Sequence, residues 1–237
     1  MSDPTGGVSP PAYRGDAVNT STPYDEHYEH FRRTREKYAR RRLHPRSALY
    51  ALADFGRPLR ARPGRRLLEL GSQLGDAAHF VSLTGAQVVG VDRNIVALRE
   101  GRAVWRRAQV PVQADLAGSI TGLPFRDAAF DGVYSRDVLE HLPGVDCVRT
   151  LFAELRRVTT PGAAMVHIVT VREDGPNLDA DPTHHIKENR SWWTEFFVQE
   201  GYEVATNTVA RTYGNNGQGW KRLVRHEGRF VLRARNV

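Results

Sequence analysis

The sequence has a single cysteine and no long apolar run. Cys147 stands alone among 237 residues, so an intramolecular disulfide is excluded. No stretch of about 18 apolar residues could span a bilayer, and the first residues lack the apolar segment of a secretory signal peptide. These absences predict a cytoplasmic protein without a membrane partner.

Lysine is also scarce, although the chain is basic. Lysine occurs only at positions 37, 187 and 221, whereas lysine and arginine together number 34 and the formal charge is +7. We interpret this preference for arginine mainly as the codon bias of a GC-rich genome. The densest basic run, from Arg32 to Arg46, is typical of a solvated helix face, and a phosphate-binding patch is the open alternative.

Length and composition predict one α/β domain with extensions. With 40% hydrophobic residues, the chain can bury a core of the size usual for about 100 to 200 residues. Residues 1–22 are rich in Gly, Pro, Ser and Thr and are predicted to be a disordered tail. We expect residues 23–60 to form a helical cap, 65–171 a cofactor-binding core, and 172–237 a substrate-side segment with a closing hairpin.

Apolar patterns of strand and helix alternate through the rest of the chain. Such alternation predicts a parallel sheet with right-handed crossovers, closed by an antiparallel hairpin. Asn94 is a predicted N-cap of one helix. The predicted strands are 66–70, 87–91, 110–114, 130–134, 163–170, 202–209 and 229–235, and the predicted helices are 23–42, 47–55, 76–84, 94–107, 137–142, 145–158 and 191–201.

The string LELGSQLG, from Leu68 to Gly75, turns from a predicted strand into a helix. The acidic residue Asp92 ends the next predicted strand, about 20 residues after the acidic Glu69. At this spacing a carboxylate can reach the ribose of a bound nucleoside. A dinucleotide site needs the pattern GxGxxG, but Gln73 and Asp76 stand where two of its glycines should be. Asp76 also places a negative charge where a phosphate would bind. The loop therefore favours a nucleoside cofactor with a positive centre and no phosphate.

This loop resembles the first motif of the class I S-adenosylmethionine-dependent methyltransferases, which reads acidic-x-Gly-x-Gly-x-Gly. Glu69, Gly71 and Gly75 match it, with Gln73 in place of the middle glycine. The segment LPFRDAAFDGVYSRDVLEHL, from residue 123 to 142, resembles the fourth-strand motif of the same family. The resemblance covers about residue 24 to the C-terminus. It implies a Rossmann-like α/β fold: a seven-stranded, mostly parallel sheet with helices on both faces, an antiparallel last strand and an N-terminal helical cap.

The resemblance implies that S-adenosyl-L-methionine is the cofactor, and the strand ends supply candidate contacts. By resemblance, Asp115 accepts a hydrogen bond from the adenine amine, while Asp92 can accept from both ribose hydroxyls. A turn, a helix cap or a solvated loop is the structural alternative at each position. The predicted cofactor-binding residues are Glu69, Gly71, Ser72, Gly75, Asp92, Arg93, Asp115, Leu116 and Ser135.

Histidine is the expected general base, since its pKa lies near the working pH. His141 ends the string DVLEHL, where several small-molecule enzymes of the family place a histidine that faces the substrate; His184 lies in DPTHH, where Asp181 could orient it. Packing or turn formation is the alternative for each. We predict no metal site, because Asp181, His184 and His185 lack a clear third carboxylate partner. The predicted substrate-binding residues are Tyr24, Tyr28, Arg136, His185, Trp192 and Trp220.

The leading hypothesis is methyl transfer to an oxygen or nitrogen of a small polar metabolite, such as a sugar or an anionic natural-product intermediate. It implies a small-molecule partner, no nucleic acid, and a monomer or homodimer. The charge of +7 keeps an RNA methyltransferase open, although the sequence has no catalytic cysteine pair, no Asn-Pro-Pro-aromatic motif and no appended RNA module. A non-catalytic interaction subunit is the third hypothesis, and Gln73 is its only support.

Overall fold

A computed structural model of the chain describes residues 45–107, 114–174, 177–205 and 228–235. The predicted tail over residues 1–22, the predicted helix over 23–42 and the candidate residues Tyr24, Tyr28 and Trp220 lie outside this range. Within the part of the chain that the structure describes, no helix is both long and apolar enough to cross a membrane.

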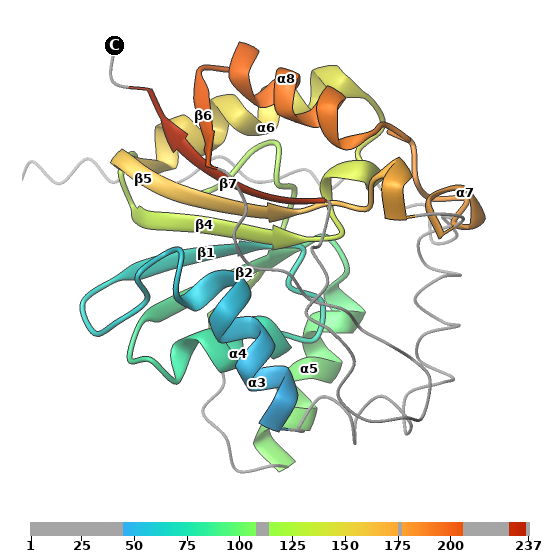
Figure 1. Ribbon diagram of the computed structural model, residues 1–237. Helices are drawn as coiled ribbons and strands as arrows, with labels where there is room; N and C mark the ends of the chain where they lie inside the picture. The colour runs from blue at the N-terminus through green and yellow to red at the C-terminus, as the bar shows by residue number, and fades with distance from the viewer. Residues whose placement is uncertain (1–44, 108–113, 175–176, 206–227, 236–237) are drawn as a thin grey trace, which may run out of the picture.

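The described strands form one seven-stranded sheet in the order β3-β2-β1-β4-β5-β7-β6 (Figure 1). The first five strands pair in parallel, and β7 runs antiparallel to both β5 and β6. This confirms the expected Rossmann-like sheet with an antiparallel last strand. The strand order reverses between β1 and β4, where such folds bind ligands at the carboxyl ends of the strands. The strands are β1 (Arg66–Leu70), β2 (Gln87–Asp92), β3 (Ala114–Ala117), β4 (Phe130–Arg136), β5 (Thr159–Ile168), β6 (Tyr202–Ala205) and β7 (Arg229–Ala234).

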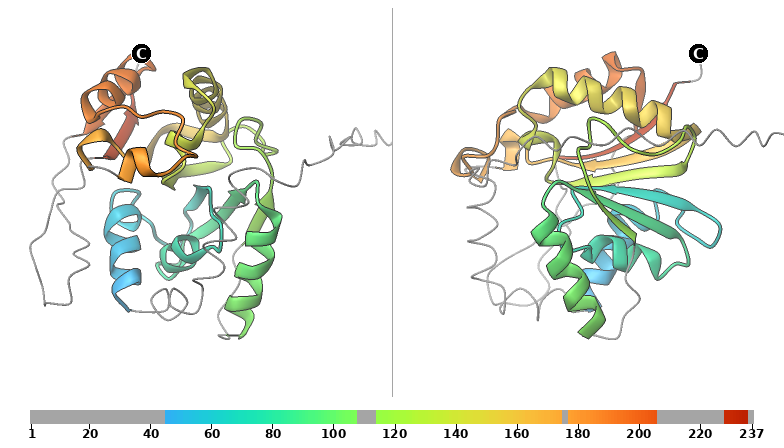
Figure 2. Two further views of the ribbon diagram at one scale, coloured as in Figure 1. Left: turned by 90° about the vertical axis from the view of Figure 1, so that its right-hand side faces the viewer. Right: turned by 180° about the vertical axis from the view of Figure 1, so that it is seen from behind.

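Helices cover both faces of the sheet: α3, α4 and α5 lie on one side, and α6 and α8 on the other (Figures 1 and 2). Successive strand residues point to opposite faces, so Leu67 packs with the first helix layer and Leu68 with the second. Two hydrophobic cores result, one on each face. The helical segments are α3 (Pro45–Ala51), η1 (Leu52–Gly56), α4 (Asp76–Ser82), α5 (Ile95–Arg107), η2 (Leu139–His141), α6 (Val145–Val158), η3 (Arg172–Asp174), α7 (Asn177–Ala180) and α8 (Arg190–Gln199).

Several predicted elements have other bounds in the structure, and two of these differences follow from local geometry. The helix predicted over 137–142 is a single 3₁₀ turn, because Asp137 has a left-handed backbone with φ at +52°, which a right-handed helix cannot include. Strand β3 was predicted to end at Ala114 but contains Ala114–Ala117, so Asp115 lies within the strand beside Gly90. The predicted strand residues 110–113 lie outside the described range. Asn94 is confirmed as an N-cap, since its Oδ1 accepts from the backbone N–H groups of Val96 and Ala97, each at 3.0 Å.

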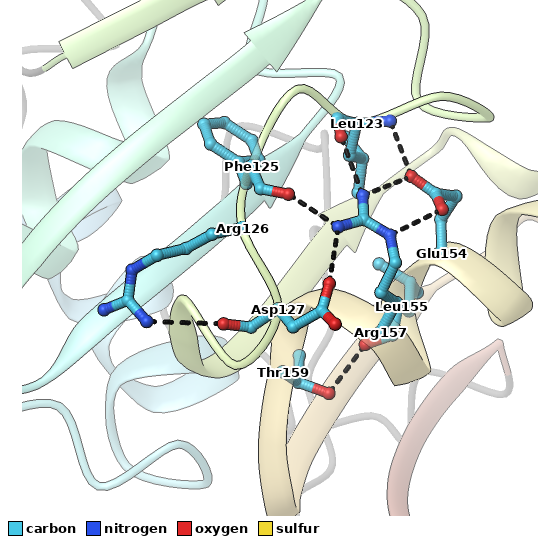
Figure 3. A network of polar contacts seen from close by, with 8 residues as sticks. All are labelled: Leu123, Phe125, Arg126, Asp127, Glu154, Leu155, Arg157 and Thr159. Atoms are coloured by element: carbon cyan, nitrogen blue, oxygen red, sulfur yellow. Dashed lines mark hydrogen bonds and ion pairs between the residues drawn. The ribbon is translucent and has the colours of Figure 1, made fainter. Parts of the chain in front are cut away.

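Arg157 on α6 fixes the loop that leads into β4 (Figure 3). Its guanidinium donates to the carbonyl oxygens of Leu123 at 2.8 Å and Phe125 at 2.6 Å, and to the carboxylates of Glu154 and Asp127. Glu154 in turn accepts from the backbone N–H of Leu123 at 2.8 Å. Since the planar guanidinium offers several donors in fixed directions, one side chain holds the whole loop. The network thereby anchors the start of β4, and the carboxyl end of this strand lies at the candidate site described below.

Candidate cofactor and acceptor site

The glycine loop after β1 has three residues with left-handed backbones. Their φ angles are +66° at Gly71, +46° at Gln73 and +75° at Gly75. A side chain at Gly71 would collide with Val138, so only glycine fits there. Gln73 thus adopts the conformation that glycine would take at this position of the motif. The departure from the glycine pattern leaves the shape of the loop intact.

Asp92 at the end of β2 holds this loop in place. Its Oδ2 accepts from the backbone N–H of Gln73 at 2.9 Å, and its Oδ1 accepts from that of Asn94 at 2.7 Å. Burial of this side chain, which is 2% exposed, raises the pKa of Asp92, and these two hydrogen bonds oppose the rise. Each carboxylate oxygen has a second lone pair, so Asp92 can also accept from hydroxyl groups.

Two polar atoms next to the loop are buried without a hydrogen-bond partner among the described residues. They are the Oγ of Ser72 and the Oδ1 of Asp115. Both lie 2.6 Å from the position that a Cβ would take on Gly90, so the missing side chain makes room for them. Burial raises the pKa of Asp115 to about 6, with Arg102 opposing the rise. Buried polar atoms normally have partners, and this pair therefore suits the polar groups of a ligand.

Glu69 lies under the loop rather than on its surface. Its Oε2 accepts a hydrogen bond from the hydroxyl of Tyr134 at 3.3 Å, and the residue is 7% exposed. Burial, reinforced by Asp76, raises the pKa of Glu69 well above its usual range. Of the other predicted cofactor residues, Arg93 is exposed and Leu116 is half-buried.

The side chain of Ser135, a predicted cofactor-binding residue, points into the core. Ser135 and His167 are both completely buried, and the serine Oγ lies 2.8 Å from the Nδ1 of the histidine. The side chain of Ser135 is thus paired within the core. Burial lowers the pKa of His167 to about 3, so this pair is a neutral contact inside the core.

Arg136, a predicted substrate residue, holds the segment before β1 in place. Its Nη2 lies 2.8 Å from the Oδ2 of Asp54 in η1, and its guanidinium lies 5.3 Å from the ring centre of Phe55. Phe55 stacks on Tyr134 of β4 with 4.6 Å between ring centres. Arg229 of β7 donates to the backbone oxygen of Asp54 at 2.9 Å. These contacts join η1 to two strands of the sheet.

The structure brings His141 and His184 together at the carboxyl end of β4, with 4.6 Å between ring centres. Thr183 donates its hydroxyl proton to Asp181 at 2.6 Å, so its Oγ1 accepts from the Nδ1–H of His141 at 2.8 Å. The Nδ1 of His184 lies 2.9 Å from the backbone oxygen of Leu178, which can only accept. Both neutral imidazoles therefore have their lone pair on Nε2. Asp181 lies 3.9 Å from the Nε2 of His184, so it orients His141 through Thr183 rather than His184 directly.

Glu140 is the residue that the sequence-based prediction missed. It is completely buried in η2, and atoms of Glu140, His141 and His184 all lie within 4.8 Å of one another. The backbone oxygen of Glu140 accepts from the N–H groups of His185 at 2.8 Å and Ile186 at 3.1 Å, which folds the later segment onto η2. Burial raises the pKa of Glu140 to about 8. A buried carboxylate that the sequence did not indicate therefore lies beside His141 and His184.

The two remaining predicted substrate residues that the structure describes do not belong to this cluster. His185 is exposed. Trp192 is half-buried and stacks on Phe196, with 5.6 Å between ring centres, while Trp193 is completely buried in the core. Trp192 therefore contributes at least part of its surface to packing.

Comparison with known proteins matches the site-bearing part of the chain. Residues 68–167 match the family model described as a methyltransferase domain. The chain is 34% identical over 110 residues to 24-methylenesterol C-methyltransferase 2 of Oryza sativa subsp. japonica, covering 46% of this chain and 30% of that protein. It is 35% identical over 108 residues to demethylmenaquinone methyltransferase of Beutenbergia cavernae, covering 46% of this chain and 42% of that protein. The chain thus spans less than half the length of these curated relatives.

A solved structure shares the fold. Phosphoethanolamine N-methyltransferase 2 of Haemonchus contortus, solved in complex with S-adenosyl-L-methionine, aligns with a TM-score of 0.55 and 22% identity. The alignment covers 67% of this chain and 38% of that chain.

Proposed function

The chain carries a class I S-adenosylmethionine-dependent methyltransferase domain, and on that premise we propose that it transfers a methyl group to an oxygen or nitrogen of a small polar metabolite. The observation that carries this proposal is the pair of buried, unpartnered oxygens of Ser72 and Asp115 beside the glycine loop, with the two histidines at the neighbouring strand end.

The residues around the loop suit the groups of the methyl donor. Asp92 has acceptor capacity for the ribose hydroxyls, and Asp115 for the adenine amine. The left-handed turn at Gly71 lets a ligand approach the backbone closely. When bound, the sulfonium donor supplies an electrophilic methyl group: the acceptor's lone pair forms the new bond while the carbon–sulfur bond breaks and its electrons return to sulfur.

The acceptor needs positioning and, if it is an alcohol, removal of a proton. The Nε2 lone pair of His141 or His184 can take that proton, because both Nδ1 atoms donate their hydrogens to protein oxygens. Thr183, whose hydroxyl donates to Asp181, accepts from the Nδ1–H of His141 and thereby holds this histidine in one tautomer. An amine acceptor that is already neutral would need positioning only.

The two alternative functions gain no support from the described residues. The basic run from Arg32 to Arg46, which motivated the RNA methyltransferase hypothesis, lies almost entirely outside them. Gln73, which motivated the non-catalytic hypothesis, keeps the loop conformation that glycine would give. Neither is proposed.

The first test is calorimetric titration of the full chain with S-adenosylhomocysteine. We expect saturable binding that Asp92→Ala abolishes, and absence of binding by the wild type would overturn the proposal. A second test follows transfer of a labelled methyl group to a panel of sugars, carboxylates and amines. His141→Ala and His184→Ala are each expected to lower kcat by about 10²-fold or more while changing cofactor affinity little. Turnover that is unchanged in both variants would exclude the histidines as bases.

A further inference from the structure

We propose that Glu140, His141 and His184 form a binding site for a divalent transition-metal ion at the carboxyl end of β4. Each residue offers one ligand atom, and the three atoms lie within 4.8 Å of one another. Glu140 and His184 are buried and His141 is half-buried, so this is not a surface gathering of acidic groups.

The first supporting observation is the state of the Glu140 carboxylate. Its Oε1 accepts from the backbone N–H of Thr170 at 2.8 Å, whereas its Oε2 is buried and has no hydrogen-bond partner among the described residues. A carboxylate oxygen in that position is costly to leave without a partner. A bound cation beside the two imidazoles would satisfy it.

The second observation is the set of contacts behind the two histidines. Metal-binding histidines almost always donate their other ring N–H to a carbonyl, a carboxylate or water, which fixes the ring and exposes the ligating nitrogen. Here His184 donates to the backbone oxygen of Leu178 at 2.9 Å, and His141 to Thr183, whose hydroxyl is in turn bound to Asp181. Both rings are thus oriented by hydrogen bonds at Nδ1, as in metal-binding histidines.

The donor set indicates which cations fit. Two imidazoles and one carboxylate suit zinc, manganese, iron(II) or cobalt, and three protein ligands leave a coordination position open. Ligands about 2.0 to 2.2 Å from a tetrahedral ion lie roughly 3.4 Å apart, so side-chain rotations of about 1 Å would complete the site. With the cation bound, the histidines would act as its ligands instead of as bases, and an acceptor oxygen in the open position would lose its proton through the charge of the cation. This last step rests on the proposed methyl transfer, whereas cation binding does not.

The test is calorimetric titration of the untagged, EDTA-treated full chain with Zn²⁺, followed by Co²⁺, whose visible absorption reports its ligands. We expect one high-affinity site, weakened about tenfold or more by Glu140→Gln and by His184→Gln. His185→Gln is the matched control, because His185 is exposed, adjacent in sequence and outside the cluster. Its affinity for Zn²⁺ is expected to equal that of the wild type.

The outcomes separate the two proposals. Binding of S-adenosylhomocysteine by each variant shows that it is folded, so loss of Zn²⁺ binding in a variant that keeps this ligand supports the site. If Glu140→Gln fails to fold, His184→Gln decides. No stoichiometric Zn²⁺ binding by the wild type, or equal binding by wild type and cluster variants, overturns the metal site and leaves the proposed function standing. Cofactor binding without Zn²⁺ binding would therefore contradict only the metal site. Zn²⁺ binding without methyl transfer would contradict only the proposed function.

Discussion

The backbone N–H of Gln73 donates to the Oδ2 of Asp92 at 2.9 Å from a left-handed conformation with φ at +46°. A residue with a Cβ adopts this conformation at a cost of about 1–2 kcal/mol. Glycine avoids that cost but loses about 0.5–1 kcal/mol through the greater freedom of its unfolded chain. The buried carboxylate of Asp92 thus holds a strained backbone in the shape that the cofactor loop requires.

Replacing Gln73 tests this strain. Gln73→Gly is expected to raise the free energy of unfolding by about 0.5 kcal/mol, because relief of the left-handed conformation outweighs the added chain entropy. Gln73→Val should lower it by about 1–2 kcal/mol, since a β-branched residue tolerates positive φ poorly. Urea denaturation measures both. Equal stabilities for the two variants would show that the loop in solution does not hold residue 73 in this conformation.

Local sequence patterns predicted several elements of the fold well. Strand β1 and helix α6 begin and end where predicted, because an apolar run bounded by a turn glycine and a 3.6-residue apolar period are both local signals. The orientation of Ser135 was not predictable in this way, since it depends on pairing with His167 in β5. The proximity of Glu140 to His184 likewise depends on a distant segment folding back onto η2. The sequence shows Glu140 next to His141, but only the tertiary structure shows that His184 lies beside them.

Gly90 offers a test of the space beside Ser72 and Asp115. A Cβ at Gly90 would lie 2.6 Å from an oxygen of each, so both must move. Gly90→Ala is expected to lower stability by about 1–3 kcal/mol and to weaken binding of S-adenosylhomocysteine by about tenfold or more. Gly118→Ala is the control, because nothing lies within 4 Å of its added Cβ. Cofactor affinity that is equal in the two variants would place the ligand elsewhere.

Substitution of Arg136 distinguishes a role in anchoring η1 from the predicted role in substrate binding. Arg136→Met removes the ion pair with Asp54, whose side chain is only 11% exposed, and should lower stability by about 2 kcal/mol. Arg149→Met removes an exposed ion pair with Asp146 and a second pair with Glu200, and because the Arg149 side chain is itself exposed it should change stability by less than about 1 kcal/mol. KM for the acceptor, once identified, should stay within about threefold of the wild type in both, which a substrate-binding arginine would not allow.

The pKa of Asp115 gives opposite pH dependences for stability and for cofactor binding. Burial raises this pKa to about 6 in the folded protein, against about 3.9 in an unfolded chain. Between these pH values the folded state binds more protons than the unfolded state, so the stability of the ligand-free protein should fall as pH rises across this window. In the proposed complex the adenine amine donates to the ionised carboxylate, so affinity for S-adenosylhomocysteine should instead fall as pH drops below about 6, by up to tenfold per pH unit.

Comparing Asp115→Asn with the wild type separates the titration of Asp115 from that of Glu69 and Asp92. The raised pKa values of those two groups are present in both the wild type and the variant. An amide keeps an acceptor oxygen and does not titrate. The variant should therefore be more stable than the wild type at pH 7 and bind S-adenosylhomocysteine with a nearly constant Kd between pH 5 and 7. The measurement is the ratio of the two Kd values across that range, together with thermal unfolding of the ligand-free proteins. Parallel pH profiles would mean that the Asp115 carboxylate does not meet the adenine, because only a direct contact ties its ionisation to cofactor affinity.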